Sequence, residues 1–393
     1  MTDSEVVVIG GGPAGALCAL GLARRGIAVT VVERARFPRT KVCGEYLNAG
    51  ALRLLDDAGL GDGVRARSVA LAGIRLVPPG LDPLELDFPA PARSLARADL
   101  DAFLLEAARA AGARVVRARA EDLVFANGRV AGARVRDPAG EVGEVRARFV
   151  VGADGSGSLV ARKLGLLREA RGAPRFALGG HYRGFGDLGA RVEMYVGGGA
   201  YFALNPLGGD LANVMVVVRQ AQLASWSAAV DAGMRGKAAE LARGVRDVDG
   251  AVRVGPRVSI GPLAFDVSAA AAPGALLAGD ASGFLNPFTG QGVYMAIRGG
   301  IDAAATLAAA LADPAREARY CAAYAARRAR LLAARRRLGR AVDLMLDVPF
   351  VAARVAGRLR NVPELGRSLL DAIGGTAPPE RALSPLALGR LLF

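Results

Sequence analysis

The stretch Val6-Val7-Val8-Ile9-Gly10-Gly11-Gly12-Pro13-Ala14-Gly15, which continues to Val29-Thr30-Val31-Val32-Glu33, decides the fold. In order, it contains an apolar β-branched run, a G-x-G-x-x-G turn, an Ala- and Leu-rich segment to Arg25, a second apolar run and an acid. This order predicts a βαβ unit that binds a dinucleotide.

Each glycine of the turn has a separate task in such a unit. Gly10 permits the tight turn, Gly12 lets the backbone approach a pyrophosphate, and Gly15 lets the helix pack closely on the strand. The helix N-terminus supplies amides and a dipole to the phosphates. Pro13 and Ala14 lie in this first turn and are expected to border the cofactor. Glu33 is expected to accept a hydrogen bond from a ribose hydroxyl. A glycine turn that merely connects strand and helix would not explain this acid.

Composition indicates a folded globular protein without a nucleic-acid partner. The chain has 393 residues, is 52% hydrophobic and carries a formal charge of +14. That length allows two domains with a large core. Only three of the 51 basic residues are lysines (Lys41, Lys163 and Lys237), so the charge reflects a general bias towards arginine.

Neither a metal centre nor a secretion signal is expected. The cysteines Cys18, Cys43 and Cys321 are too few and too scattered for a zinc site or a disulfide framework. His181 is the one histidine of the chain, which argues against a His-rich metal site. Acidic residues near the N-terminus and the lack of a long uncharged apolar run predict a cytoplasmic protein.

Elements along the chain suggest two interleaved domains and a helical tail. Helices are expected at 49–58, 99–111, 222–243 and 292–311, and throughout the region after 315, with breaks at Pro349 and Pro363. Strands are expected within 68–88, 114–151 and 176–219, with hairpin turns at 127–128 and 139–140. The predicted nucleotide domain comprises residues 1–67, 92–172 and 270–311. The predicted substrate domain comprises 68–91 and 173–269, and the helical tail comprises 312–393.

Three separated segments fit one ligand: the N-terminal βαβ unit, Gly152-Ala153-Asp154-Gly155, and Gly279-Asp280 after a short apolar strand. Together they resemble FAD-dependent enzymes with the para-hydroxybenzoate hydroxylase fold. The resemblance covers residues 5–311 and implies an α/β (α+β) architecture, in which a Rossmann-like FAD-binding domain is interleaved with a mainly antiparallel substrate domain.

The resemblance also implies roles for single residues. Gly10, Gly12, Gly15 and Glu33 would hold the ADP half of FAD. Arg97 would approach the diphosphate, Asp280 would contact the ribityl chain, and Asp154 would brace the fold nearby. Taken alone, Asp154 is a common turn residue and Asp280 a common helix cap.

Two segments are similar to the geranylgeranyl reductase-related flavoprotein dehydrogenases of this superfamily. One is Lys41-Val42-Cys43-Gly44-Glu45, and the other runs from Gly279 to Gly300 with Asn286-Pro287 and Gly290-Gln291-Gly292. Aromatic hydroxylases usually have a histidine where this chain has Gly283. By this likeness, further FAD contacts come from Arg34, Lys41, Cys43, Gly279, Pro287, Gly290, Gln291 and Gly292.

The strand Tyr201-Phe202-Ala203-Leu204-Asn205-Pro206 departs from the family pattern. The reductases have Tyr-x-Trp-x-Phe-Pro there, and flavin halogenases have Trp-x-Trp-x-Ile-Pro. Ala203 in place of tryptophan and Asn205 in place of an apolar residue weaken both a halogenase and a polyprenyl-substrate interpretation. Period-2 geometry puts Tyr201, Ala203 and Asn205 on one face, which we expect to line the substrate cavity.

We therefore expect an FAD-dependent oxidoreductase acting on a hydrophobic organic substrate. NAD(P)H, or another donor, would visit transiently, since only one G-x-G-x-x-G opens a helix. Reduction of a carbon–carbon double bond is the first hypothesis, with candidate catalytic residues Cys43, Tyr201 and Asn205. Hydroxylation is the alternative, and a non-enzymatic flavin-binding module is a third. Cys43 either donates a proton or packs beneath the ring.

The arginine-rich segment 315–340 allows a peripheral membrane contact. Its basic residues include Arg327, Arg328, Arg330, Arg335, Arg336 and Arg337. They could lie on an anionic lipid surface and deliver lipid-like substrates. The alternative is a solvated helix face in an arginine-rich protein.

Overall fold

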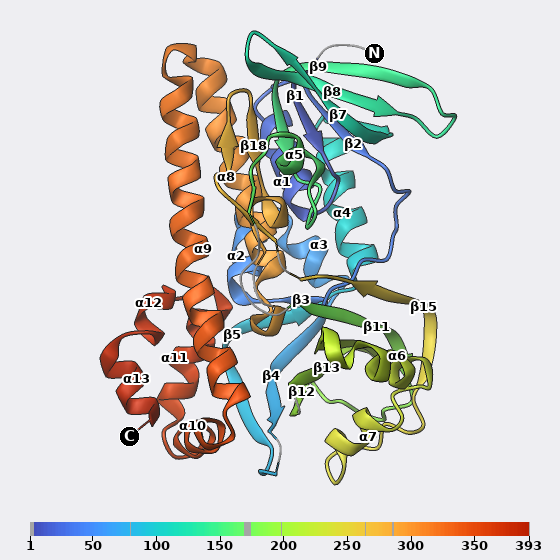
Figure 1. Cartoon of the computed structure of the whole chain (residues 1–393), viewed down its shortest axis with the longest axis vertical. Coiled ribbons are helices and arrows are strands. Elements are labelled where there is room, and N and C mark those ends of the chain that lie inside the picture. The colour runs from blue at the N-terminus through green and yellow to red at the C-terminus, as the bar shows by residue number, and fades with distance from the viewer. Residues whose placement is uncertain are drawn as a thin grey trace.

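The computed structural model describes residues 4–78, 80–168, 174–197, 199–263, 265–284 and 287–392. Within these ranges the chain forms two eight-stranded sheets and a group of C-terminal helices (Figure 1). The mixed α/β architecture with a Rossmann-like unit and a helical tail confirms the predicted fold class. Asn286, which belonged to one predicted motif, lies outside the described residues.

The first sheet is built around β1 (Ser4–Ile9) and β2 (Val29–Glu33), which are parallel with Val6 opposite Val29. On the far side of β1 lies β9 (Val142–Gly152), followed by β18 (Ala275–Leu277), both parallel to it. The edges are β6 (Arg114–Arg117) beside β2, and β17 (Ala271–Ala272) beside β18. Parallel strands covered on both faces need continuous apolar runs, which explains the valine-rich sequence of β1 and β2.

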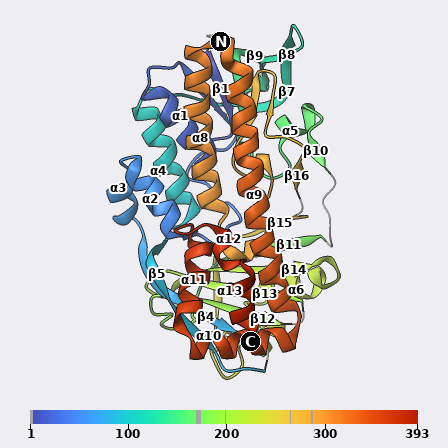
Figure 2. The ribbon, with the colours of Figure 1, turned by 90° about the vertical axis from the view of Figure 1, so that its left-hand side faces the viewer.

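Helices cover one face of this sheet and a hairpin covers the other. Figure 2 shows α4 (Arg97–Ala110), α1 (Pro13–Ala23), α8 (Gly292–Ala312) and α9 (Glu317–Asp347) side by side. The opposite face packs against α5 (Leu159–Lys163) and against β7 (Arg119–Ala126) and β8 (Arg129–Arg136). These two strands complete the eight of the first sheet, because β8 pairs with β9 and β7 pairs with β8. The turn between β7 and β8 is Asn127-Gly128, with both residues at positive φ, as the hairpin prediction requires.

The second sheet is mainly antiparallel. Its central strands are β11 (Arg175–Arg183), β14 (Leu211–Arg219), β13 (Ala200–Gly208) and β12 (Arg191–Gly197), in that spatial order. Beyond β12 come β4 (Val69–Val77), parallel to it, then β5 (Leu84–Ser94) and β3 (Tyr46–Leu47). At the other edge lies β15 (Val252–Ile260). β3 and the end of β5 thus lie in this sheet, although the predicted boundaries assign them to the nucleotide domain.

Helices pack on the face of the second sheet that points away from the first. They are α6 (Leu223–Asp231) and α7 (Lys237–Ala242), with Trp226 in their core. The prediction of one continuous helix over 222–243 is wrong. The backbone has positive φ at Gly233, Met234 and Gly236, which an α-helix cannot contain, so the segment is broken into two helices.

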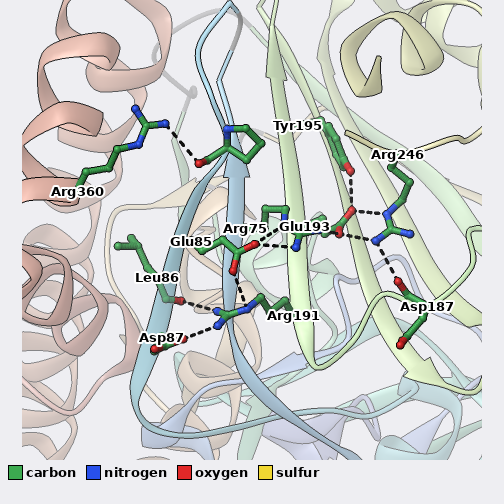
Figure 3. A network of polar contacts seen from close by, with 11 residues as sticks. Arg75, Glu85, Leu86, Asp87, Asp187, Arg191, Glu193, Tyr195, Arg246 and Arg360 are labelled. Atoms are coloured by element: carbon green, nitrogen blue, oxygen red, sulfur yellow. Dashed lines mark hydrogen bonds and ion pairs between the residues drawn. The ribbon is translucent and has the colours of Figure 1, made fainter. Parts of the chain in front are cut away.

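A buried carboxylate, Glu193, links several side chains on the same outer face of the second sheet. Glu193 of β12 has no exposed surface, and both of its oxygens are bonded (Figure 3). Arg75 of β4 donates at 2.7 Å, Arg246 donates at 2.7 Å to each oxygen, and the Tyr195 hydroxyl donates at 2.5 Å. A buried charge is tolerated only when it is paired and hydrogen-bonded. The network ties β4, β12 and the segment after α7 together.

The C-terminal region is helical, and its breaks at Pro349 and Pro363 are confirmed. α10 (Pro349–Asn361) and α11 (Pro363–Gly374) each begin at a proline, which fits the first helical position because its missing N–H is not needed there. They pack on β5 with α13 (Pro385–Leu392). The remaining elements are α2 (Ala49–Asp57), α3 (Gly61–Arg65), α12 (Pro379–Ala382), β10 (Leu167–Arg168) and β16 (Asp266–Val267).

The arginines of α9 divide between the interior and the surface. Arg328 and Arg335 are buried, and Arg336 pairs with Asp266 at 2.8 Å. These three are therefore not available to a membrane surface, whereas Arg330 and Arg337 are exposed. In the described ranges α8 alone is long and apolar enough to cross a membrane, and half of its apolar stretch is buried in the protein.

Candidate flavin and substrate site

A cavity of about 1080 Å³ lies between the two sheets. Its first-sheet half is lined by Gly10, Gly12, Pro13, Ala14, Glu33, Arg34, Arg39, Lys41, Arg97, Asp154, Gly279 and Asp280. Its second-sheet half is lined by Ile74, Phe88, Ala177, Val192, Met194, Tyr201, Ala203, Asn205, Met215, Val217, Ile260 and Leu263. The first half is rich in charge and the second is almost wholly apolar, so the cavity suits a charged cofactor beside a hydrophobic substrate.

The glycines of the βαβ turn occupy three different environments. Gly10 has φ +101°, and a Cβ there would lie 2.5 Å from the Ala153 carbonyl oxygen. A Cβ at Gly15 would lie 1.8 Å from the Gly10 carbonyl oxygen, so this glycine serves helix packing and does not line the cavity. A Cβ at Gly12 would meet only the Arg39 side chain, at 3.5 Å. Gly12 therefore leaves the amides at the start of α1 open to a ligand.

Glu33 is held by the turn itself. Its Oε2 accepts a hydrogen bond from the Gly11 amide and its Oε1 accepts one from the Ala35 amide, both at 2.7 Å. The carboxylate lines the cavity at the end of β2. Each carboxylate oxygen has a second lone pair, so the pre-oriented group can still accept from a ribose hydroxyl.

Three cations gather beside the start of α1. Arg97 forms a two-pronged ion pair with the fully buried Asp101 at 2.7 Å, and Arg39 approaches the same carboxylate at 3.1 Å. Lys41 lies nearby, and burial together with Arg97 and Arg39 lowers its pKa. One shared carboxylate leaves this group net positive, as a diphosphate requires. Sequence reasoning identified Arg97 and Lys41 but missed Arg39 and Asp101, whose spacing carries no motif.

The two predicted carboxylates differ in what they bind. Asp154 accepts from the Ser158 hydroxyl at 2.6 Å and from the Leu159 amide at 2.7 Å, so it caps the start of α5. Asp280 lines the cavity, and no donor among the described residues hydrogen-bonds to its carboxylate, although its backbone carbonyl accepts from the Gly283 amide. Burial raises its pKa, against the opposing effect of Lys41, Arg97 and Arg328. Asp280 is thus free to accept from a ligand, whereas Asp154 acts mainly within the fold.

Of the residues between 279 and 292 that are predicted to contact the cofactor, all but Gln291 border the cavity. Gly279, Pro287, Gly290 and Gly292 line it, and a Cβ at Gly292 would meet nothing within 4 Å. Gln291 does not line it, since its Oε1 accepts instead from Arg335 of α9 at 2.7 Å. The prediction that Gln291 faces the cofactor therefore disagrees with its placement.

An arginine of α9 supports the turn that carries Asp280. Arg328 is 1% exposed and donates to the Ser282 hydroxyl at 2.6 Å and to the Gly279 carbonyl at 3.3 Å. Nothing in the sequence distinguishes Arg328 from its many arginine neighbours, so sequence reasoning did not identify this role.

Cys43 lies where the charged and apolar halves meet. Its Sγ accepts from the Glu45 amide at 3.3 Å. Burial raises the pKa of the thiol, and the nearby Arg97 opposes this effect without reversing it. The thiol therefore keeps its proton at neutral pH. Arg97 is the cation that acts on the thiol most strongly.

The strand β13 presents the expected face to the cavity. Tyr201, Ala203 and Asn205 line it, whereas Phe202 and Leu204 are buried under α6 and α7. Asn205 does not offer its amide to a ligand. Its Oδ1 accepts from Ser94 at 2.7 Å, and its Nδ2 donates to the Gly44 and Glu45 carbonyls at 2.8 and 3.1 Å.

Aromatic and C-terminal side chains complete the apolar half. The Tyr201 ring packs edge-on against Phe288, with centroids 5.0 Å apart, and Tyr46 packs on Phe88 at 5.6 Å. Leu370 and Ile373 of α11 also border the cavity. The C-terminal helices therefore contribute to the wall, which sequence reasoning did not anticipate.

The residues present fit FAD. A helix start without a side-chain cap, a cation group with net positive charge, a pre-oriented carboxylate and the available Asp280 correspond to diphosphate, ribose and ribityl groups. In the described parts of the chain, no group of three or more His, Cys, Asp or Glu residues forms a metal site.

Sequence similarity to relatives of known activity extends over about three quarters of the chain. It is 32% identical over 309 residues to digeranylgeranylglycerophospholipid reductase 1 of Methanopyrus kandleri, covering 75% of this chain and 78% of that one. It is 27% identical over 314 residues to the 1H-pyrrole-2-carbonyl-(peptidyl-carrier protein) brominase of Pseudoalteromonas luteoviolacea, covering 76% of each.

The same fold occurs in a solved structure. The flavin-dependent brominase Bmp2 superposes with a TM-score of 0.83 at 23% identity, covering 99% of this chain and 98% of that chain. The model of the FAD binding domain family matches residues 3–337. This chain belongs to the FAD binding domain family and is an FAD-dependent oxidoreductase.

Proposed function

We propose that this enzyme passes electrons from NAD(P)H, through FAD, to a carbon–carbon double bond of a hydrophobic small molecule. The observation that carries the proposal is the position of the Cys43 thiol at the junction of the charged and apolar halves, where burial raises its pKa. Double-bond reduction needs a proton as well as a hydride, and Cys43 is placed to supply it. The reductase relative at 32% identity supports the same reaction class.

The protein's own groups divide the work. The α1 N-terminus with Arg39, Lys41 and Arg97 would hold the diphosphate, Glu33 the ribose and Asp280 the ribityl chain. When bound, FAD supplies the hydride transfer. Tyr46, Phe88, Tyr201 and Phe288 exclude water and orient an apolar substrate. Cys43 donates the proton that completes the reduced bond.

The substrate is proposed to be bulkier than a polyprenyl chain in the part that lies beside Ala203. Ala203 leaves open the volume that a tryptophan would fill on β13, and Met194 and Met215 are cavity neighbours with adaptable side chains. Among the residues that line the second-sheet half of the cavity, none has a charged side chain. This half therefore has no group that would recognise an ionic substrate.

Anaerobic turnover tests the reaction class. Protein loaded with FAD and reduced by NADPH or NADH is mixed, without oxygen, with a panel of hydrophobic enones and polyenes. Flavin reoxidation with formation of a product two hydrogens heavier supports the proposal. Reoxidation that requires both oxygen and substrate would instead select hydroxylation, and an additional requirement for bromide or chloride would select halogenation.

A further inference from the structure

Three polar residues form a row across the centre of the second sheet. His181 of β11 lies opposite Asn213 of β14, which lies opposite Asn205 of β13. Asn205 and Asn213 are 2% and 3% exposed, and His181 is partly buried. We call these residues the polar row. Neighbours two residues away on β13 and β14, Ala203 and Met215, line the cavity, so the row continues the cavity face.

All three members of the polar row bind the segment 43–45. Asn213 Nδ2 donates to the Cys43 carbonyl at 2.6 Å, and Asn205 Nδ2 donates to the Gly44 and Glu45 carbonyls. His181 Nε2 lies 2.7 Å from the Glu45 carboxylate. The Ser94 hydroxyl bonds Asn205 Oδ1 and so fixes which end of that amide faces the segment.

The segment needs this support because its backbone is strained. Glu45 has φ +57°, a left-handed conformation that a residue with a side chain rarely adopts. Its carbonyl also accepts from the Leu95 amide at 3.0 Å, and its Oε1 accepts from the Arg97 amide at 2.8 Å. Strained backbone persists only where several surrounding contacts hold it. Here those contacts come from strands of the second sheet, from Leu95 directly after β5, and from the start of α4.

We infer that His181, Asn205 and Asn213 are positioning residues, which hold the strained segment 43–45 so that the Cys43 thiol stays at the junction of the two cavity halves. Their catalytic importance rests on the proposed reduction, but the positioning itself does not. None of the three touches the reacting atoms through this contact. Each acts on the backbone or on the Glu45 carboxylate.

His181 makes the positioning sensitive to pH. Its hydrogen bond to Glu45 raises the pKa of the imidazole, against a smaller opposing effect of burial. Asp99 is the other charged group that acts on it, and its strand neighbours Asn213 and Val254 are uncharged. The ion pair with Glu45 is complete below the raised pKa and loses its charge as the pH rises through that value.

Alkylation of Cys43 by iodoacetamide tests the inference without any turnover. The measurement uses the FAD-loaded full chain carrying Cys321→Ser, since Cys18 is fully buried. Asn213→Ala and His181→Phe each remove one hydrogen bond to the segment, so each should raise the alkylation rate about fivefold. Asn361→Ala, which removes an exposed asparagine at the end of α10, is the matched control and should leave the rate unchanged.

The pH profile separates positioning by charge from simple packing. Glutamine at position 181 can donate to Glu45 but does not titrate, so His181→Gln should alkylate slowly and show the thiol ionisation alone. The parent protein should show an additional rise near the raised pKa of His181. Flavin content and melting temperature identify variants that fail to fold. If Asn213→Ala or His181→Phe fails to fold, the comparison of the parent and His181→Gln pH profiles still applies.

Two results would overturn the inference. One is an alkylation rate in folded Asn213→Ala and His181→Phe equal to that of the parent. The other is a parent pH profile that coincides with that of His181→Gln. A clear positioning effect together with no double-bond reduction would reject the proposed function and leave the positioning role intact.

Discussion

Gly12→Val should weaken FAD binding without weakening the apoprotein. The Gly12 backbone has φ −70° and ψ −176°, which valine adopts readily. Its Cβ would contact only Arg39, at 3.5 Å, so the folded chain accommodates the new side chain. The branched methyl groups would instead enter the space in front of the first α1 amides, where the pyrophosphate is expected.

The size of the effect follows from the contacts that are lost. A hydrogen bond to a charged group contributes about 1.5–3 kcal/mol. Loss of one amide–phosphate bond therefore raises the Kd for FAD about ten- to a hundredfold. Gly15→Ala is a control that should instead destabilise the folded protein. Its Cβ would lie 1.8 Å from the Gly10 carbonyl oxygen, so the backbone of the turn would have to move.

Titration of the apoprotein with FAD, followed by quenching of flavin fluorescence, measures the Kd. Circular dichroism gives the melting temperature of each apoprotein. We expect a weaker Kd with an unchanged melting temperature for Gly12→Val, and a large loss of folded protein for Gly15→Ala. A wild-type Kd in folded Gly12→Val would refute the placement of the pyrophosphate at this helix start.

Four further substitutions, at three positions, test the cavity. Asp280→Ala should raise the Kd for FAD about tenfold while the chain still folds, since the carboxylate takes no hydrogen bond from the described residues; full flavin affinity would leave it a role only as a helix cap. Ala203→Trp should slow turnover of a bulky substrate with flavin content unchanged, and identical kinetics would show that this part of the cavity holds no substrate. Cys43→Ser should slow the substrate half-reaction in stopped flow while NAD(P)H-driven flavin reduction stays fast, whereas equal slowing of both would indicate that Cys43 positions the ring. If Cys43 only packs, Cys43→Ala should be tolerated in both half-reactions.

Local patterns predicted most of the fold. The valine run, the glycine turn and the acid of residues 6–33 specify a βαβ unit through interactions within that stretch, and the structure confirms it. The sequence also predicts which side chains of β13 face the cavity, because the side chains of a strand alternate between its two faces through backbone geometry alone. At 233–236 two glycines interrupt a helical pattern, and the positive φ of Gly233, Met234 and Gly236 divides the predicted helix in two.

The amino-acid sequence by itself determined the fold class, the cofactor and the face of β13 that lines the cavity. Tertiary structure alone decided how the site is assembled. Arg39 and Asp101 meet because α4 packs beside α1, and Asn205, Asn213 and His181 become neighbours only through strand register. Such contacts join residues far apart in the chain, so no sequence spacing records them. Whether an asparagine binds a substrate or a backbone carbonyl depends on what the fold brings within about 3 Å of its amide.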